Sequence, residues 1–576
     1  MIEIKEISPL KVSGVSSLWV TFPYADHIVQ AMKTMPVYYY HKKQYAWEIP
    51  INYLSRLLDN LTFLDDIKLT LLDVPESGII PRKKVYNQPP LDEKEKVSFR
   101  VDPFPHQLEA IDYGLDKERW LLLDSMGLGK TNEIIWLAEI LKRRGIIDHC
   151  LIICCVNSLK QNWKKEIKKF STESAIVLGE YTTRTGTIRY RSLEQRAEQL
   201  RNPIEEFFVI TNIESLRDDR IIEAFKNSSN NFGMIAVDEA HKASTKSSTQ
   251  GANLLKLSAP YMISATGTLI TNNPLSAYLP LSWTKNDSAI LSTYKQQYCN
   301  YGGFAGKQVI GYKNLDLLRD ELLTCSLRRT LDQVRSDMPS KTVTLEVVEL
   351  DDAQRKFYDA IKEGVKEEAD KIELKSANLL ALTTRLRQAT ACPELLTTQK
   401  VPSAKVDRCL EIIEELLSQN EKVVVLSMFK ETVANLSAKL SELQIKHSIN
   451  TGDYSDAWVA QNVEKFQEDP EERVFIGTWG KAGTGWTLNA SAYLVCLDTP
   501  YTAAMFDQGT DRIWRVNNTR PAFITVLIGK DTIDERVQQI IETKKHLSDY
   551  IVDGKEDSYI EQGGLDDELR AIIRDL

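Results

Sequence analysis

The chain has 576 residues, more than one hydrophobic core usually supports, so we expect two or three domains. Its composition of 43% hydrophobic and 27% charged residues is that of an ordinary soluble protein, and without a long apolar run or signal-peptide pattern we expect an intracellular location. The formal net charge of −9 excludes attraction of nucleic acid by the average field, and eight cysteines without a C-x-x-C pair predict reduced thiols and no structural zinc.

The first 95 residues are rich in Tyr and Trp and are expected to form a domain of their own. The pattern predicts a helix, a hairpin with the basic turn HKK, and a second helix over residues 51–61. Aromatic side chains beside lysines suit a contact with branched or single-stranded DNA. The alternative is that Tyr38, Tyr40 and Trp47 form a small core. A charged segment with prolines marks the boundary at residue 95.

Short apolar runs then recur between helical stretches, the pattern of parallel strands covered on both faces. A first series predicts strands at residues 120–123, 150–156, 207–211, 234–237 and 261–264. A second series predicts strands at 423–427, 474–478, 493–497 and 523–528. Between them, residues 275–410 are expected to be mostly helical, and the charged run DAQRKFYDAIKEGVKEEADKIELK to be a solvated helix face. The sequence therefore predicts two doubly wound α/β units.

The stretch LLLDSMGLGKT, residues 121–131, predicts a phosphate-binding loop, although Asp124 stands where the usual pattern has its first glycine. A strand stops, two glycines allow a tight turn, a lysine reaches the phosphates, and a helix presents its N-terminus to the charge. Thr131 offers its hydroxyl to Mg²⁺. The predicted ATP-binding residues in this loop are Met126, Gly127, Leu128, Gly129, Lys130 and Thr131.

The run MIAVDEAH, residues 234–241, is an apolar strand that ends in two adjacent carboxylates. Asp238 is expected to bind Mg²⁺ through water, and Glu239 to orient or deprotonate the attacking water. The alternative is that both acids merely cap the next helix. Together with the loop upstream, this strand predicts ATP hydrolysis.

The string DSMGLGKT with DEAH resembles the SWI/SNF-type helicase-like ATPases of superfamily two, over about residues 100–570. In that family the loop begins D-E-M-G-L-G-K-T, so Asp124 is the expected residue and Ser125 is the departure. The resemblance implies an α/β fold of two RecA-like doubly wound parallel-sheet lobes with helical insertions, and ATP and Mg²⁺ as ligands. The element FPHQLEAI looks like the family's adenine-recognising segment, which implies that Gln107 hydrogen-bonds the base.

The motif DQGTDRIWR matches the last motif of the family. Phosphoryl transfer spreads negative charge over the γ-phosphate oxygens, and an arginine from a second lobe can stabilise it. Arg512 and Arg515 are three positions apart and share one helix face. By the resemblance Arg515 is the finger and Arg512 its partner; the alternative is a basic face with ordinary salt bridges.

Several further motifs resemble the segments with which this family touches DNA, among them CVNSLKQNWKKEIKKF, TNIESLR and GTWGKAGTGWTLNAS. A translocase should meet the phosphodiester backbone without reading sequence. The element SATGTLITNN resembles the one that couples hydrolysis to the DNA contact, and LRRTLDQVRSDMPSK the hinge region. The implied DNA-binding residues are Ser158, Lys160, Asn162 and Thr211 in the first lobe, and Thr478, Lys481, Gly483 and Gly485 in the second.

The N-terminal part resembles the HARP module of annealing-helicase members of this family, through the helix, the M-K-x-x-P run and the Tyr and Trp strands. The expected domains are a small α+β HARP-like DNA-binding domain (residues 1–95), lobe 1 (96–340), lobe 2 (341–555) and a tail helix (556–576). Both lobes are expected to carry helical insertions.

The expected function is a DNA-dependent ATPase that translocates on double-stranded or branched DNA, such as a fork, and remodels or reanneals it. One alternative is a strand-separating helicase that acts on forks or recombination intermediates. Another is an ATP-gated binding protein for a protein partner. We expect a monomer without membrane contact, from a bacterium or phage and working in the bacterial cytoplasm, because the tails and basic targeting runs of nuclear relatives are absent.

Overall fold

The computed structural model describes most of the chain from residue 88 to residue 553. The gaps in this range are residues 156–158, 185–187, 244–247, 272, 285–290, 303–307, 336–338, 372–375, 483–485 and 516–517. Before residue 88 it describes residues 2–7, 17–22, 29, 32, 39–50, 57 and 67–70. No helix within these described stretches is long and apolar enough to cross a membrane.

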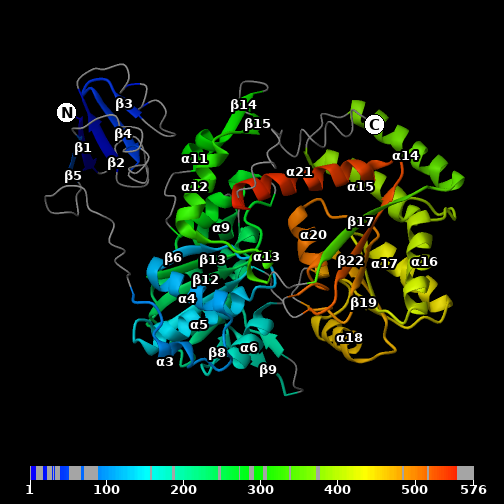
Figure 1. The fold of residues 1–576 in the computed structure, drawn as a ribbon, viewed down its shortest axis with the longest axis horizontal. Helices are drawn as coiled ribbons and strands as arrows, with labels where there is room; N and C mark the ends of the chain where they lie inside the picture. The colour runs from blue at the N-terminus through cyan, green and yellow to red at the C-terminus, as the bar shows by residue number, and fades with distance from the viewer. Residues whose placement is uncertain are drawn as a thin grey trace.

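Lobe 1 is built on a seven-stranded sheet in which all neighbouring strands are parallel (Figure 1). The five strands predicted for it are confirmed, and the two short edge strands were not predicted. In sheet order the strands are β16 (Ser326–Leu327), β6 (Arg119–Leu122), β13 (Tyr261–Ala265), β12 (Phe232–Asp238), β7 (His149–Cys154), β11 (Phe208–Asn212) and β8 (Ala175–Val177).

Helices cover both faces of this sheet, which explains why its strands are continuous apolar runs. Along β7, Ile152 packs into one hydrophobic core and the next residue, Ile153, into the other. One face carries α4 (Pro105–Lys117), α5 (Lys130–Arg143) and α6 (Leu159–Phe170). The other carries α7 (Leu193–Arg201), α8 (Asp219–Lys226), α9 (Thr249–Leu254) and α10 (Tyr278–Trp283).

Lobe 2 contains a second, six-stranded sheet, again with parallel neighbours throughout. Its order is β17 (Lys341–Val348), β22 (Ala522–Gly529), β21 (Tyr493–Cys496), β18 (Val423–Ser427), β20 (Val474–Thr478) and β19 (His447–Asn450). The flanking helices include α16 (Ala404–Ser418), α17 (Lys430–Glu442), α18 (Asp456–Glu468) and α20 (Ala503–Thr510). The four predicted strands are present, so both lobes are RecA-like units as expected.

The region between the two predicted series is mostly helical, as expected, but it also contains strands that were not predicted. Besides α11 (Leu291–Tyr298), α12 (Leu315–Cys325) and α15 (Ser376–Ala391) it contains the hairpin β14 (Cys299–Gly302) and β15 (Gln308–Tyr312), and the strand β17. Strand β17 lies at the edge of its sheet and is largely exposed, so it lacks the apolar run of a central strand. The charged run forms α14 (Asp352–Lys371), but Tyr358 and Val365 are buried, so this helix is amphipathic and not only a solvated face.

The N-terminal part forms a five-stranded mixed sheet, drawn apart from the two lobes in Figure 1. Its order is β3 (Tyr39–His41), β4 (Ala46–Pro50), β2 (Ser17–Thr21), β1 (Ile2–Ile7) and β5 (Ile67–Thr70). The predicted hairpin is β3 and β4. Trp47 is a core residue, whereas Tyr40 is 38% exposed, so the predicted small core is present only in part and a DNA contact stays a prediction. Tyr38, the tail helix and all of the two predicted helices except residues 29, 32 and 57 lie outside the described residues.

The first element of lobe 1 begins earlier than predicted. The backbone N–H of Gln88 donates to the carbonyl of Leu115, and Leu91 and Phe99 belong to the hydrophobic core of lobe 1. Arg144 also pairs with Glu95 of the short helix α3 (Glu93–Lys96) at 2.7 Å. Residues 88–95 therefore pack on lobe 1, which differs from the predicted boundary at residue 95.

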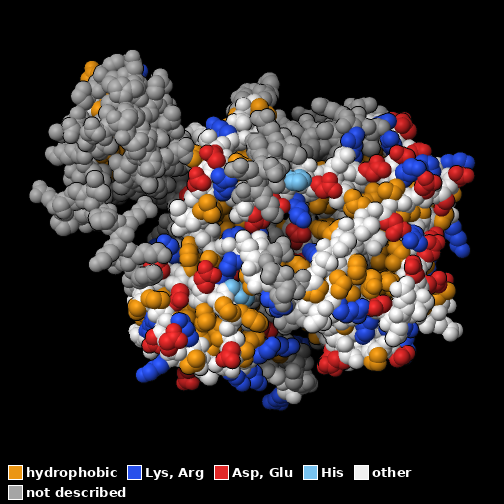
Figure 2. Space-filling model, in the orientation of Figure 1, with side chains coloured by type: hydrophobic (Ala, Val, Ile, Leu, Met, Phe, Trp, Pro, Cys, Tyr) orange, Lys and Arg blue, Asp and Glu red, His pale blue; other side chains and the backbone are white. Residues whose placement is uncertain are grey.

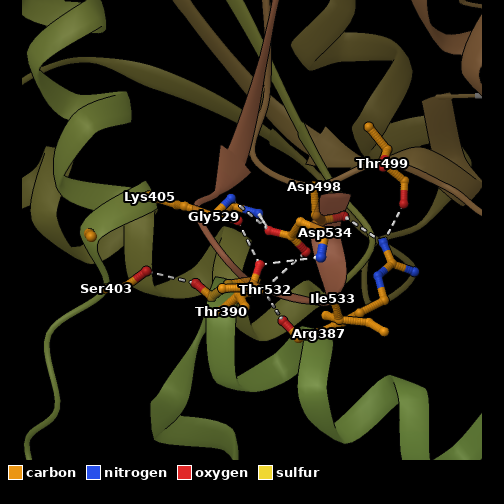
Figure 3. Close-up of polar contacts among 12 residues, drawn as sticks. Arg387, Thr390, Ser403, Lys405, Asp498, Thr499, Gly529, Thr532, Ile533 and Asp534 are labelled. Carbon is orange, nitrogen blue, oxygen red and sulfur yellow. Dashed lines mark hydrogen bonds and ion pairs between the residues drawn. The ribbon is translucent and has the colours of Figure 1, made fainter. Parts of the chain in front are cut away.

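The long helix α21 (Ile533–Asp553) joins the two lobes. Its start is fixed in lobe 2 by a buried polar network, in which Lys405 Nζ donates to Asp534 Oδ2 at 2.7 Å and Thr390 Oγ1 to Asp534 Oδ1 at 3.2 Å (Figure 3). Its end is fixed in lobe 1, where Arg328 Nε donates to Asp553 Oδ1 at 2.7 Å. The helix thus holds the lobes next to each other, and the site described below lies between them.

Candidate functional site

The predicted phosphate-binding loop has the conformation that its glycines suggest. It connects β6 to α5, and Gly127 and Gly129 have φ angles of +83° and +92°, a region that favours glycine. Helix α5 starts at Lys130, so the unpaired N–H groups of its first turn face the loop. Lys130 Nζ donates to the backbone carbonyls of Asp124 at 2.7 Å and Ser125 at 3.2 Å. Burial lowers the pKa of this lysine.

Asp124, the residue that interrupts the usual loop pattern, is a fully buried ion-pair partner. Both of its carboxylate oxygens accept from Arg329 Nε at 3.1 Å, and Oδ2 also accepts from Nη2. The same guanidinium donates to Glu133 Oε1 of α5 at 2.9 Å and to the backbone carbonyl of His106. Arg329, in the segment that follows β16, therefore connects the phosphate loop to α5 and α4 through these hydrogen bonds. The sequence placed Arg329 only within a hinge-like pattern and did not pair it with Asp124.

Gln107 has a different position from the one that adenine recognition suggests. It is 3% exposed, its Nε2 donates to the carbonyl of Leu128 at 3.1 Å, and its Oε1 accepts from the backbone N–H of Phe104 at 2.9 Å. Both ends of the amide are thus used within the protein, because α4 packs directly against the loop. In this structure Gln107 supports the phosphate loop, and its contact with a base stays a prediction.

The two acids of DEAH lie at the carboxyl end of β12, beside the loop. Asp238 Oδ2 accepts from the indole nitrogen of Trp163 at 2.8 Å. Glu239 has a positive φ of +54°, unusual for a residue other than glycine, and such strain is typical of functional sites. His241 Nδ1 lies 3.3 Å from Glu239 Oε2 and 2.9 Å from Thr266 Oγ1 of the SATGT element. The alternative that both acids only cap a helix does not account for these contacts.

The pKa values of the two acids shift in opposite directions. Burial and the neighbouring charge of Glu239 raise the pKa of Asp238. Burial would also raise the pKa of Glu239, but the hydrogen bond and charge of His241, with Lys130 and Lys242, lower it below its ordinary value. Glu239 is therefore ionised at neutral pH, and its Oε2 is shielded from solvent beside His241.

Both predicted arginines of lobe 2 reach this site. A Cβ atom built on Gly127 would lie 3.8 Å from Cδ and 3.9 Å from Nη1 of Arg515. Arg515 Nε is shielded from solvent and has no hydrogen-bond partner within the described part of the chain. Arg512 is buried, and burial and the nearby Arg515 lower its pKa to about 9 while the charge of Glu239 acts in the opposite direction. One buried and one partly buried guanidinium next to a phosphate loop favour the binding of an anion.

The residues present fit a magnesium ion held together with phosphates. Thr131 lies in the first turn of α5, and Asp238 and Glu239 supply the oxygen atoms that Mg²⁺ prefers. No group of three or more His, Cys, Asp or Glu side chains forms a metal cage in the described stretches. Mg²⁺ is usually bound by one or two carboxylates and substrate phosphates, and Asp238 and Glu239 are two carboxylates at the carboxyl end of β12, beside the loop.

A cavity of about 180 Å³ adjoins the loop on the side of the lobe interface. Ser125, the departure from the family pattern, and Arg328 line it from lobe 1, together with Lys341, Asp507 and Asp511 of lobe 2. Lys341 Nζ donates to Asp511 Oδ1 at 2.7 Å. A longer side chain at position 125 would extend toward the charged residues of this interlobe cavity.

The predicted DNA-binding residues divide into three groups. Asn162 on α6 is exposed, and Thr478 at the end of β20 and Lys481 on α19 (Trp479–Ala482) are partly buried. Lys160 and Thr211 are buried, which differs from the prediction: Lys160 Nζ lies 4.0 Å from the centroid of the Tyr190 ring, and Thr211 lies within β11. The remaining three, Ser158, Gly483 and Gly485, lie outside the described residues.

Figure 2 shows acidic and basic side chains intermixed on the face drawn, in agreement with the negative net charge.

Comparisons with known proteins agree with this arrangement. A family model described as SNF2-related domain matches residues 83–395, and one described as helicase conserved C-terminal domain matches residues 404–517. An uncharacterized ATP-dependent helicase of Mycoplasma pneumoniae is 27% identical over 515 residues, which cover 87% of this chain and 46% of that protein. The DNA annealing helicase and endonuclease ZRANB3 of Bos taurus is 24% identical over 481 residues, which cover 80% of this chain and 41% of that protein.

A solved structure, the Sulfolobus solfataricus SWI2/SNF2 ATPase core in complex with dsDNA, is 22% identical and has a TM-score of 0.36. The match covers 81% of this chain and 96% of the chain in that structure. The chain spans about half the length of the curated relatives it matches. Because the SNF2-related model alone matches more than half of the sequence, the chain belongs to the SNF2-related family of helicase-like ATPases.

Proposed function

We propose that this protein is a DNA-dependent ATPase that translocates on double-stranded or branched DNA and remodels or reanneals it. The observation that carries the proposal is the position of Arg515, a lobe 2 residue whose guanidinium lies beside Gly127 in the phosphate loop of lobe 1. A γ-phosphate in the loop would supply the partner that buried Nε lacks. Hydrolysis would then be linked to the relative position of the lobes, which is the requirement for a motor.

The remaining side chains of the site have consistent roles in this proposal. Lys130 and the N–H groups of the loop and of the first turn of α5 bind the phosphates of ATP. Thr131 and Asp238 hold Mg²⁺, which neutralises phosphate charge when bound. Glu239, ionised and fixed by its contact with His241, orients the attacking water. Arg512 and Arg515 stabilise the charge that develops on the transferred phosphoryl group.

The hydrogen bond between His241 and Thr266 supports the coupling of hydrolysis to DNA. Thr266 is the third residue of the SATGT element and directly follows β13, and His241 lies two residues after the acid that orients water. A movement of the segment with His241 would displace the segment with Thr266, and the reverse, because this buried hydrogen bond of 2.9 Å connects them. Asn162, Thr478 and Lys481 are the described candidates for contacts with the phosphodiester backbone, and polar side chains of this kind bind it without reading sequence.

The N-terminal sheet is proposed to be a HARP-like module that ends before Gln88 and contacts branched DNA. Its β3 and β4 hairpin exposes Tyr39, Tyr40 and Tyr45 around a turn that contains Lys42 and Lys43. Exposed aromatic rings beside lysines suit the stacking of unpaired bases at a branch point. One relative, ZRANB3, is named as a DNA annealing helicase. Bacterial relatives in Mycoplasma and Bacillus support a bacterial or phage protein, which we propose to act as a monomer in the bacterial cytoplasm.

The test is the ATPase rate of the full chain with no DNA, single-stranded DNA, duplex and a model fork. The proposal expects stimulation by duplex and fork, together with reannealing of a plasmid bubble and no separation of a blunt duplex. Separation of the blunt duplex would instead identify a strand-separating helicase. An ATPase rate that no DNA changes would refute the translocase and favour an ATP-gated binding protein.

A further inference from the structure

Trp163 connects the predicted DNA-contacting helix to the metal-binding acid. It lies on α6, is 1% exposed, and directly follows the exposed Asn162. Its indole Nε1 donates to Asp238 Oδ2 at 2.8 Å, across a sequence separation of 75 positions. A buried side chain on one face of α6 thus touches the site of hydrolysis, while its neighbour on the other face reaches solvent.

The backbone of Asp238 is already fixed without Trp163. Strand β12 pairs with β7 as far as Asp238 and Cys154, and the N–H of Cys155 donates to the carbonyl of Asp238 at 3.1 Å. Only the rotation of the carboxylate about its side-chain bonds is left to be determined. Trp163 is the single side chain that donates a hydrogen bond to this carboxylate within the described residues.

The indole of Trp163 can only be the donor in its hydrogen bond with Asp238. An indole N–H can donate but cannot accept, so the bond favours the ionised carboxylate and cannot reverse. Because Nε1 occupies Oδ2, Oδ1 is the oxygen that remains for a hydrated Mg²⁺. Side chains that hydrogen-bond a metal ligand orient it, and their removal typically lowers metal affinity 10- to 100-fold.

We infer that Trp163 is a positioning residue, which holds the Asp238 carboxylate in its magnesium-binding orientation and makes that orientation depend on the position of α6. The inference rests on the proposed function, in which α6 contacts DNA and Asp238 holds Mg²⁺. A movement of α6 upon DNA binding would reach Asp238 through the indole. Trp163 therefore acts through Asp238 and does not itself touch ATP.

The experiment measures binding without hydrolysis, with a fluorescent non-hydrolysable ATP analogue titrated at increasing Mg²⁺ in the full chain. In Trp163→Phe, the Mg²⁺ concentration for half-maximal tightening of analogue binding should rise about 10- to 100-fold. Binding of the analogue in excess EDTA should equal that of the unaltered protein, because the phosphate loop is intact. An unchanged Mg²⁺ requirement in Trp163→Phe would overturn the inference.

The matched control is Trp136→Phe. Trp136 is also 1% exposed in lobe 1, but its Nε1 donates to the backbone carbonyl of Phe170 at 3.1 Å. This variant loses the same N–H and the same ring area and should keep the Mg²⁺ requirement of the unaltered protein. An equal shift in both variants would assign the effect to lobe 1 packing and overturn the inference.

Two further measurements keep the inference testable. If Trp163→Phe does not fold, site-specific replacement of Trp163 by benzothienylalanine keeps the ring shape and removes only the N–H, with the same expected shift. Duplex DNA should change the Mg²⁺ requirement of the unaltered protein and leave that of Trp163→Phe unchanged; the same DNA effect in both would refute the link through α6. A protein whose ATPase rate ignores DNA would refute the proposed translocase, whereas the titration without DNA would still decide whether Trp163 orients Asp238.

Discussion

Replacing Arg329 by Met should loosen the phosphate loop more than replacing Asp124 by Asn. Arg329 is 8% exposed and faces Asp124 and Glu133, which are 0% and 2% exposed. Without the guanidinium, two buried carboxylates lose their partner, and breaking a buried pair in this way costs about 3–5 kcal/mol. In Asp124→Asn the guanidinium keeps Glu133 at 2.9 Å, so the cost should be about 1–3 kcal/mol.

Protonation of Glu133 limits the loss of stability in Arg329→Met. Burial and the charge of Asp124 already raise its pKa, so in Arg329→Met it can take up a proton and remove one of the two buried charges. The loss should therefore lie nearer 3 than 5 kcal/mol at neutral pH and increase as the pH rises and Glu133 ionises.

Hydrogen exchange of the full chain, followed by mass spectrometry on peptides that cover residues 124–133, measures this loss locally. A loss of about 3–5 kcal/mol corresponds to exchange faster by about two to four powers of ten. The control is Arg220→Met, which removes an exposed ion pair with Asp218 in the same lobe and should leave these peptides unchanged. The reasoning would be refuted if Arg329→Met resembled the control, or if Asp124→Asn loosened the loop more.

Three other predictions concern the site and its surroundings. Arg515→Ala should lower kcat about 10³- to 10⁵-fold in steady-state ATPase assays while nucleotide binding changes little; a small loss in kcat would contradict the finger role. Glu239→Gln should bind ATP but lose turnover about 10²- to 10⁴-fold, whereas Lys130→Ala should lose ATP binding or turnover. Nucleotide titration measures the binding and phosphate release measures the turnover. Turnover in Glu239→Gln equal to that of the unaltered protein would exclude Glu239 as the residue that orients the attacking water. Lys160→Met should stabilise the protein at pH 7, because burial and Arg196 lower the pKa of Lys160 to about 8. The free energy of unfolding of the unaltered protein should therefore increase as the pH rises from about 8 to the ordinary pKa of 10.5. Urea unfolding of the variant should show no such increase from this group.

The sequence by itself determined the central strands, the phosphate loop and the acidic pair. Central parallel strands are buried on both faces, so they appear as short apolar runs that can be recognised without their partners. The loop is equally local, since its glycines, lysine and following helix are consecutive, and glycine adopts the positive φ angles of Gly127 and Gly129 without steric cost. Edge strands such as β17 were missed because they lack a continuous apolar run.

Only the tertiary structure decided which distant side chains meet in the site. Arg329 and Asp124 are 205 positions apart, and Trp163 and Asp238 are 75 apart, so no pattern of spacing relates them. The positions of Gln107 and Lys160 were likewise set by the packing of α4 and α6 against the sheet, which buried groups that the motifs suggested would be available. Periodicity carries information about one element and its buried face, whereas contacts between elements follow from the order of the strands and the helices that pack on them.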